Sequence, residues 1–195
     1  MVKTPSTMLA LGTPAPAFRL PDVVSGTMVS LESFPPGSAL LVMFIGPHCP
    51  FVQHVQEELA RVGRDYQDQS IGIVAICAND AETFPGDGPA GLRTMAATLG
   101  FTFPVCFDAT QETARAYAAA CTPDFFLFDR ERKLVYRGQL DGTRPGGAPP
   151  TGADLRTAVD AVLAGRPVSQ EQLPSLGCNI KWRPGNEPDY FTSGA

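Results

Sequence analysis

The sulfur of Cys49 is the atom in this sequence that is best placed for nucleophilic chemistry. Cys49 lies in segment 46–52, GPHCPFV, directly after the apolar run 39–45 and directly before apolar residues at helical spacing. Pro50 suits the first position of a helix, where its missing N–H costs no hydrogen bond. We therefore expect Cys49 at a helix N-terminus, where unpaired N–H groups and the helix dipole favour a reactive thiolate. His48 would add positive charge there. The alternative role for Cys49 is that of a small buried side chain.

The elements that must hold Cys49 alternate between buried strands and helices. Short apolar runs bounded by turn residues predict strands, and apolar residues spaced three and four apart predict helices. This alternation, closed by a hairpin, predicts an α/β fold with a central mixed sheet and helices on both faces. We expect strands at 28–31, 39–45, 71–77, 103–107, 125–128 and 134–137, and helices at 50–66, 90–99, 110–119 and 154–163.

Domain organisation follows from the length and from the last segment of the chain. A chain of 195 residues with 44% hydrophobic residues fits one domain with a full core. We expect this domain to span residues 1–182. Residues 183–195 contain proline and glycine and are expected to form a mobile tail.

Composition limits the partners. The net charge is −5 and there is no Lys/Arg cluster, so neither nucleic acid nor an anionic membrane is an expected partner. The apolar runs are far shorter than the ~20 residues that span a bilayer, and the start does not resemble a signal peptide. We therefore expect a cytoplasmic protein whose five cysteines are thiols. The cysteines lack the short paired spacing of a metal site, and we expect no metal and no other cofactor.

Four segments carry a resemblance to a known family. They are 12–21 (GTPAPAFRLP), 48–52 (HCPFV), 103–108 (FPVCFD) and 121–129 (CTPDFFLFD). Their order and spacing resemble the thioredoxin superfamily. The closest resemblance is to its peroxiredoxin-like branch of small bacterial proteins, the AhpC/TSA-type redoxins. The likeness extends from about residue 11 to about residue 182. It implies a thioredoxin-like, three-layer α/β/α sandwich and an oxidoreductase that acts in redox homeostasis or as an antioxidant.

The resemblance also implies roles for particular residues. Cys49 matches the nucleophilic first cysteine of the thioredoxin motif. Pro123 matches the cis-proline that lies against this cysteine. Thr122 and Pro123 would present their backbone to a substrate, and His48 and Pro50 would border the same site.

Five positions depart from the family patterns. Val52 stands where thioredoxins have the second cysteine, and Met43 stands where they have a buried carboxylate. His48 replaces the tryptophan before the nucleophile. Peroxiredoxins have Thr or Ser where this chain has Gly46, and proline where it has Val42. A dithiol cycle within the 49–52 turn is therefore impossible, and the hydroxyl group that activates peroxide is missing from its usual position.

A second thiol must then come from elsewhere, because a mixed disulfide needs a thiolate to release it. Cys121, two residues before Pro123, either resolves the intermediate or packs at a helix end. Cys178 lies beyond the last expected helix. It either folds over the active site or belongs to a strand or stub that Ile180 and Trp182 anchor to the core; the second role is favoured. An external reductant, such as a thioredoxin-type protein or a low-molecular-weight thiol, is the remaining source.

Three functions remain open. The first is a thiol–disulfide oxidoreductase in which Cys49 attacks a protein or small-molecule disulfide, and Cys121 or another thiol resolves it. The second is a thiol peroxidase, in which Cys49 becomes a sulfenic acid that another thiol recycles. The third is a redox-inert module that holds an extended peptide along the edge at Pro123.

Overall fold

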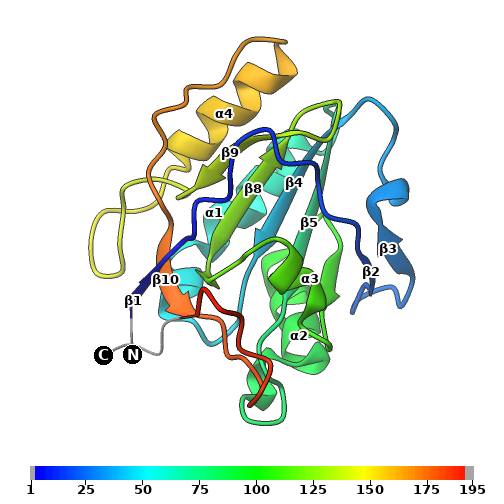
Figure 1. The fold of residues 1–195 in the computed structure, drawn as a ribbon, viewed down its shortest axis with the longest axis vertical. Helices are drawn as coiled ribbons and strands as arrows, with labels where there is room; N and C mark the ends of the chain where they lie inside the picture. The colour runs from blue at the N-terminus through cyan, green and yellow to red at the C-terminus, as the bar shows by residue number, and fades with distance from the viewer. Residues whose placement is uncertain (1–2, 192–195) are drawn as a thin grey trace.

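The computed structural model describes residues 3–191, and a five-stranded mixed sheet forms its centre (Figure 1). The strand order is β6-β5-β4-β8-β9. β4, β5 and β6 run parallel, and β8 and β9 are antiparallel to their neighbours. The bounds are β4 Ala39–Phe44, β5 Ile71–Cys77, β6 Val105–Phe107, β8 Asp124–Phe128 and β9 Leu134–Gly138.

Alternation along the central strands separates two apolar cores, one on each face of the sheet. Every residue of β4 and β5 is buried, as expected for strands that are covered on both sides. Met43 pairs with Ala75 and Phe125 in one core, whereas the next residue, Phe44, belongs to the other core.

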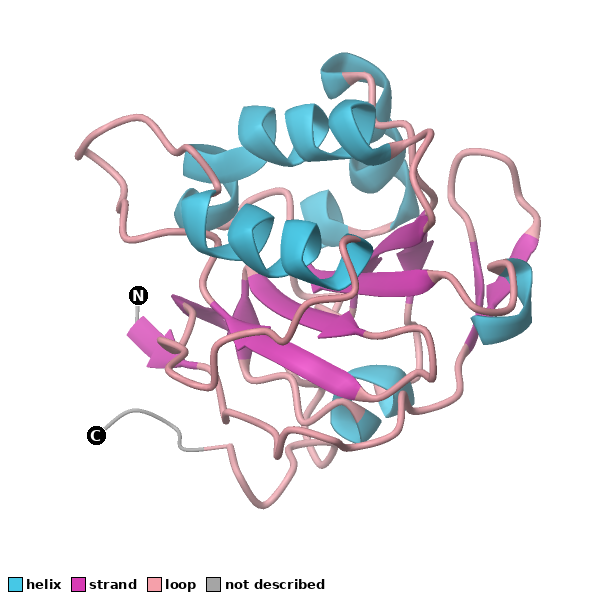
Figure 2. Cartoon of the chain, turned by 90° about the horizontal axis from the view of Figure 1, so that it is seen from above, coloured by secondary structure: helices cyan, strands magenta, loops and turns pink. Residues whose placement is uncertain are grey.

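Three longer helices cover one face of the sheet (Figure 2). They are α1 Pro50–Tyr66, α2 Pro89–Leu99 and α4 Ala153–Leu163. The opposite face is covered by the short helix α3, Glu112–Ala116, together with irregular chain. The expected helix at 110–119 is longer than α3, because Ala118 adopts a positive φ of 49° that ends the helix. The fold is the expected thioredoxin-like α/β/α sandwich.

Two small sheets flank the central one. β2, Arg19–Pro21, pairs with β3, Met28–Ser30. The other small sheet has the order β1-β10-β7, formed by Lys3–Pro5, Leu176–Asn179 and Cys121–Thr122. It brings the two ends of the described chain to the residues that precede β8 (Figure 1). Two short 3₁₀ helices, η1 Leu31–Ser33 and η2 Pro85–Asp87, complete the fold.

The segment after β10 packs on the face that carries α3. Ile180 and Trp182 are buried in that core, as the sequence favoured. Tyr190 donates hydrogen bonds to the carbonyl groups of Ala114 and Ala119. Residues 183–191 thus make specific contacts, and residues 192–195 lie outside the described part of the chain. The predicted mobility of 183–195 and the boundary at residue 182 stay predictions. Within 3–191, no helix has both the length and the apolar character needed to cross a membrane.

Candidate active site

Cys49 is the N-cap residue of α1, and Pro50 follows it at the first helical position, as expected. The carbonyl group of Cys49 accepts the first helical hydrogen bond, from the N–H of Gln53 at 2.9 Å. The side chain is only 1% exposed. The turn between β4 and α1 therefore holds the sulfur at the positive end of a 17-residue helix.

The peptide bond between Thr122 and Pro123 is cis, as the resemblance implied. It lies directly against the nucleophile: the thiol of Cys49 donates to the carbonyl oxygen of Thr122 over 3.1 Å. The hydroxyl group of Thr122 is buried and has no hydrogen-bond partner. The sulfur therefore faces both a carbonyl oxygen and an unused hydroxyl group of one residue.

Cys178 provides a second sulfur at the same place. Its Sγ atom is 2.9 Å from the Sγ atom of Cys49, and its side chain is 3% exposed. β10 pairs antiparallel with β7 so that Cys178 stands opposite Thr122. Paired residues of neighbouring strands project from the same face of a sheet, so this register directs Cys178 toward Cys49.

Gly177 allows this strand to approach. A Cβ atom at position 177 would lie 2.0 Å from the carbonyl oxygen of Thr122, so any larger residue would force β10 away. The edge at Pro123 is therefore filled by the chain's own strand. In the hypothesis of a redox-inert module, an extended peptide could pair opposite Thr122 only by displacing β10.

The two facing sulfurs are strongly unequal in acidity. The hydrogen bond with Cys178 lowers the pKa of Cys49 to about 6, against burial, which raises it; the Thr122 side chain and the N–H groups of Val52 and Cys178 also lower it. The same contact with Cys49, together with burial, raises the pKa of Cys178, although Lys181 acts in the opposite direction. In the ionised pair, Cys49 is the thiolate and the thiol of Cys178 donates to it.

Cys121 points elsewhere. Successive side chains of a strand project from opposite faces, so Cys121 faces away from Thr122 and contacts the carbonyl oxygen of Pro123, at 3.7 Å. Burial raises its pKa well above the usual value. The sequence ranked Cys121 above Cys178 as the resolving thiol, and the geometry reverses that order. Cys77 and Cys106 are buried in the central strands, and burial raises the pKa of both.

A buried carboxylate holds the turn before Cys49. Asp87 of η2 is fully buried, and its Oδ2 contacts Nδ1 of His48, a contact that is an ion pair when the imidazole is protonated. It also accepts hydrogen bonds from the backbone N–H of His48, at 3.1 Å, and from Nδ2 of Asn79, at 2.6 Å. The His48 ring stacks on Phe84, with centroids 5.1 Å apart. Gly46 leaves room for Asn79, because a Cβ atom there would lie 2.7 Å from Nδ2.

Sequence reasoning missed Asp87 and Asn79. Both lie in the segment after β5. The available signal was position: polar residues that follow a parallel strand gather at the end of the sheet where ligands usually bind. His54 contacts the loop after β9, since its Nε2 is 3.0 Å from the hydroxyl oxygen of Thr143.

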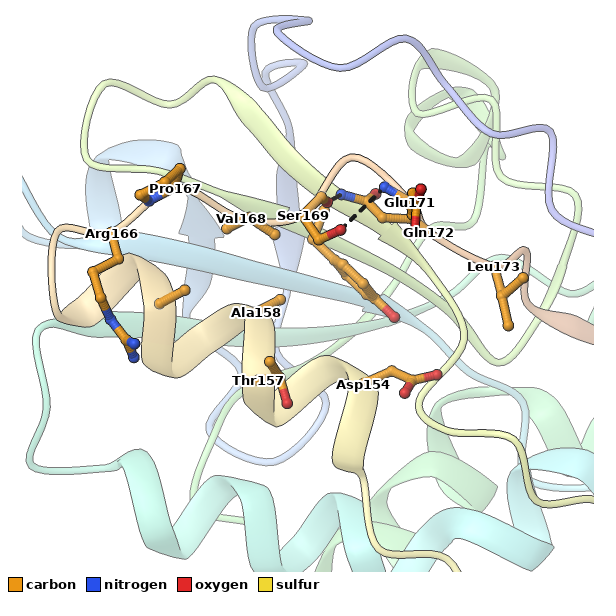
Figure 3. Close-up of a pocket in the computed structure, with 12 residues that line it drawn as sticks. Asp154, Thr157, Ala158, Arg166, Pro167, Val168, Ser169, Glu171, Gln172 and Leu173 are labelled. Carbon is orange, nitrogen blue, oxygen red and sulfur yellow. Dashed lines mark hydrogen bonds between the residues drawn. The ribbon is translucent and has the colours of Figure 1, made fainter.

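A cavity lies beside α4, and side chains of α4 and of the segment after it line it (Figure 3). It measures about 560 Å³ and lies between α4 and segment 166–173. Its lining contains no cysteine or histidine, so the concave surface and the nucleophile are separate features. No cluster of three or more His, Cys, Asp or Glu residues suited to a metal ion occurs within 3–191.

Comparison with known proteins defines the family. The AhpC/TSA family model matches residues 11–137, which is more than half of the chain. The chain belongs to the AhpC/TSA family. A curated relative, the thiol-disulfide oxidoreductase ResA of Geobacillus thermodenitrificans, is 26% identical over 131 residues, covering 67% of this chain and 70% of ResA. These matches agree with the prediction of a thiol-dependent oxidoreductase.

Solved structures support the fold. An uncharacterized conserved protein from Geobacillus kaustophilus is 51% identical, with a TM-score of 0.92 over 94% of this chain and 98% of the other. A thiol:disulfide interchange protein of the thioredoxin family from Chlorobium tepidum is 22% identical, with a TM-score of 0.62 over 79% of this chain and 98% of the other. At that identity, the second match identifies the shared thioredoxin-like fold alone.

Proposed function

We propose that this AhpC/TSA-family protein is a thiol–disulfide oxidoreductase with Cys49 as nucleophile and Cys178 as resolving thiol. One arrangement carries the proposal: two sulfurs lie 2.9 Å apart at the N-terminus of a helix, where their hydrogen bond lowers the pKa of Cys49. A thiolate at neutral pH beside a protonated partner is the arrangement that thiol–disulfide exchange requires.

The reaction has two exchange steps. The Cys49 thiolate attacks one sulfur of a disulfide RSSR, forms a mixed disulfide and releases RS⁻, which takes a proton from water. Cys178 then loses its proton to water, attacks Sγ of Cys49 and releases the second RS⁻, which takes up a proton. The substrate gains two electrons and becomes two thiols, and the protein gains a Cys49–Cys178 disulfide.

The electrostatics set the order of these steps. The thiolate of Cys49 is the main cause of the raised pKa of Cys178. Formation of the mixed disulfide removes that negative charge, while the positive charge of Lys181 stays near Cys178. Cys178 therefore becomes easier to ionise only once Cys49 has reacted.

The neighbours of the sulfur pair have supporting roles in this proposal. The carbonyl oxygen of Thr122 accepts from Cys49 while Cys49 is a thiol, and the peptide bond to Pro123 is cis. His48, held by Asp87, and Pro50 form the half-buried border through which a substrate would arrive. An external thiol, either a thioredoxin-type protein or a low-molecular-weight thiol, would return the disulfide to the reduced state. Location in the cytoplasm stays a prediction.

The test is intact mass and peptide mapping of the protein after mild oxidation. We expect the mass of the protein to fall by that of two hydrogen atoms. We expect the peptide map to contain one bridged pair that joins Cys49 to Cys178. The variant Cys121→Ser should form the same bridge, whereas Cys178→Ser should accumulate mixed disulfides at Cys49. A bridge from Cys49 to Cys121, or no bridge in the wild type, would contradict the proposal.

Peroxide reduction is a second candidate because of one hydroxyl group. The Thr122 side chain lowers the pKa of Cys49, and no other group binds its buried hydroxyl. This hydroxyl group lies beside Cys49, whereas Gly46 gives the turn before Cys49 no hydroxyl group. A hydroperoxide would convert the thiolate to a sulfenic acid and leave as an alcohol or water, and Cys178 would condense with that acid to release water.

Stopped-flow oxidation by hydrogen peroxide tests the second candidate. We expect wild-type Cys49 to react faster than an unfolded-chain thiol and Thr122→Val to lose that advantage. Equal rates for the wild type and for a simple thiol would exclude the peroxidase while leaving the disulfide chemistry untouched.

A further inference from the structure

β10 stands where an extended substrate would have to pair. β10 pairs with the edge of β7 that adjoins the sulfur of Cys49, and this pairing sets Cys178 opposite Thr122. The outer edge of β10 is covered in turn by β1. An incoming polypeptide therefore cannot add a strand at this edge of β7 while β10 is in place.

β10 is also firmly held at both ends. Before the strand, the hydroxyl group of Ser175 donates to the carbonyl of Gly138 at 2.7 Å. After the strand, the N–H of Lys181 donates to Oδ1 of Asn79 at 2.9 Å, and the carbonyl of Lys181 accepts from the N–H of Asp80 at 2.8 Å. A peptide that displaced β10 would have to break these bonds together with the pairing to β1 and β7.

Neighbouring groups leave Cys49 only 1% exposed and Cys178 only 3% exposed. Half-buried His48, Phe84 and Lys181 gather on one side: the His48 ring stacks on Phe84, and Nζ of Lys181 is 5.8 Å from the centre of the same ring. A cavity of about 280 Å³ adjoins this group and is lined in part by Phe84, Asn179 and Lys181. The volume of this cavity is slightly below the lower end of the usual range for ligand pockets, so it suits a small molecule.

We propose that the substrates of the Cys49–Cys178 pair are low-molecular-weight disulfides, and that β10 excludes extended polypeptides by occupying the edge of β7. The inference rests on the proposed thiol–disulfide chemistry of Cys49. The overall change is RSSR plus two protein thiols to two RSH plus the Cys49–Cys178 disulfide. Small size is required because the substrate must reach a nearly enclosed sulfur without removing the strand that carries the second one.

The experiment compares two disulfides that have the same sulfur chemistry. One is the symmetric disulfide of a capped single cysteine; the other is the same disulfide at the centre of an unstructured peptide of about ten residues. Each rate with the reduced full chain is divided by the rate with dithiothreitol, so that intrinsic reactivity cancels. We expect the normalised rate to be at least about tenfold higher for the small disulfide, equivalent to about 1.4 kcal/mol.

A strand variant links the selectivity to β10. Gly177→Ala should push the strand from Thr122, because its Cβ would meet the carbonyl oxygen, and should raise the normalised peptide rate relative to the small disulfide. Gly142→Ala is the matched control, since its Cβ would meet nothing within 4 Å, and it should keep the wild-type ratio. If Gly177→Ala does not fold, Cys178→Ala keeps the strand but cannot resolve, and adduct formation by the two disulfides is then compared by intact mass.

The outcomes separate the two proposals. Equal normalised rates that both exceed the rate of an unfolded-chain thiol would overturn the size selectivity and leave the oxidoreductase standing. A higher normalised rate for the peptide disulfide would also overturn the size selectivity and leave the oxidoreductase standing. If neither disulfide reacts faster than a simple thiol, the proposed function fails, and the inference fails with it.

Discussion

At the residue scale, the acidity of Cys49 depends on a neighbour 129 positions away in the chain. A helix N-terminus alone lowers a cysteine pKa, yet the largest contribution here is the hydrogen bond with Cys178. The reactivity of Cys49 therefore depends on where Cys178 lies. A change at position 178 should alter the first step of the reaction as well as the second.

The pH dependence of alkylation tests this coupling. Because only the thiolate reacts, the rate for wild-type Cys49 should rise with pH through a midpoint near 6 and then level off. Cys178→Ala removes the main stabilising donor, so its midpoint should move to higher pH. Iodoacetamide labelling followed by peptide mass spectrometry gives both midpoints. A midpoint at or above ~8.5, the value of an unperturbed cysteine, in the wild type would contradict the assignment.

Asp87 should contribute to stability through the three groups that it holds. Asp87→Ala would leave Nδ2 of Asn79 and the backbone N–H of His48 without their acceptor in a buried place. We expect the free energy of unfolding to fall by about 2–4 kcal/mol, measured by urea denaturation. Glu82→Ala is the control from the same loop, because that side chain is 86% exposed. An equal effect of the two substitutions would show that Asp87 does not hold the turn.

At the element scale, the entry into β8 contains a buried acid that opposes folding at neutral pH. Both carboxylate oxygens of Asp124 are buried without a hydrogen-bond partner, and burial raises its pKa well above 3.8. For an acid with a raised pKa in the folded state, folding takes up a proton. Stability is therefore lost as pH rises above 3.8 toward the folded pKa.

Asp124→Asn removes that loss. The variant should be more stable than the wild type at pH 7 by about 1–3 kcal/mol, and the difference should shrink as the pH is lowered toward 4. Thermal melts at several pH values measure it. Asp68→Asn, at an exposed position after α1, should show no such trend. A constant difference at all pH values would mean that ionisation of Asp124 is not the cause.

The elements that could be predicted from the sequence are those with a strong local signal. The expected helix at 50–66 and strand at 71–77 coincide with α1 and β5, because hydrophobic periodicity and Pro50 define their ends. β10 had no such signal: Leu176–Asn179 contains glycine and asparagine, which are poor strand formers. It is a strand because β1 and β7 pair with it.

The same distinction explains the candidate site. Cys49 and the cis-proline could be found from neighbours in sequence, whereas Cys178 and Asp87 reach the site only through tertiary structure. Cys121 was ranked first because it is close to Pro123 along the chain. Strand alternation, which turns adjacent side chains to opposite faces, makes that proximity misleading.

At the scale of the whole molecule, oxidation should stabilise the fold. A Cys49–Cys178 disulfide would close a loop between residues 129 positions apart, which reduces the entropy of the unfolded chain. We expect the oxidised protein to exceed the reduced one by about 2–5 kcal/mol. Chemical denaturation with and without reductant measures the difference, and Cys178→Ala should abolish it. Identical midpoints for the oxidised and reduced wild type would argue against the bridge.

The pairing of β1 with β10 ties the first described residues to the chemistry of the last strand. Lys3 stands opposite Cys178, and Thr4 stands opposite Gly177. An affinity tag, a fusion partner or proteolytic trimming at this end would consequently act on the redox centre. Preparations that differ only in their N-terminal residues should therefore be compared for thiol reactivity before an activity is assigned to the protein.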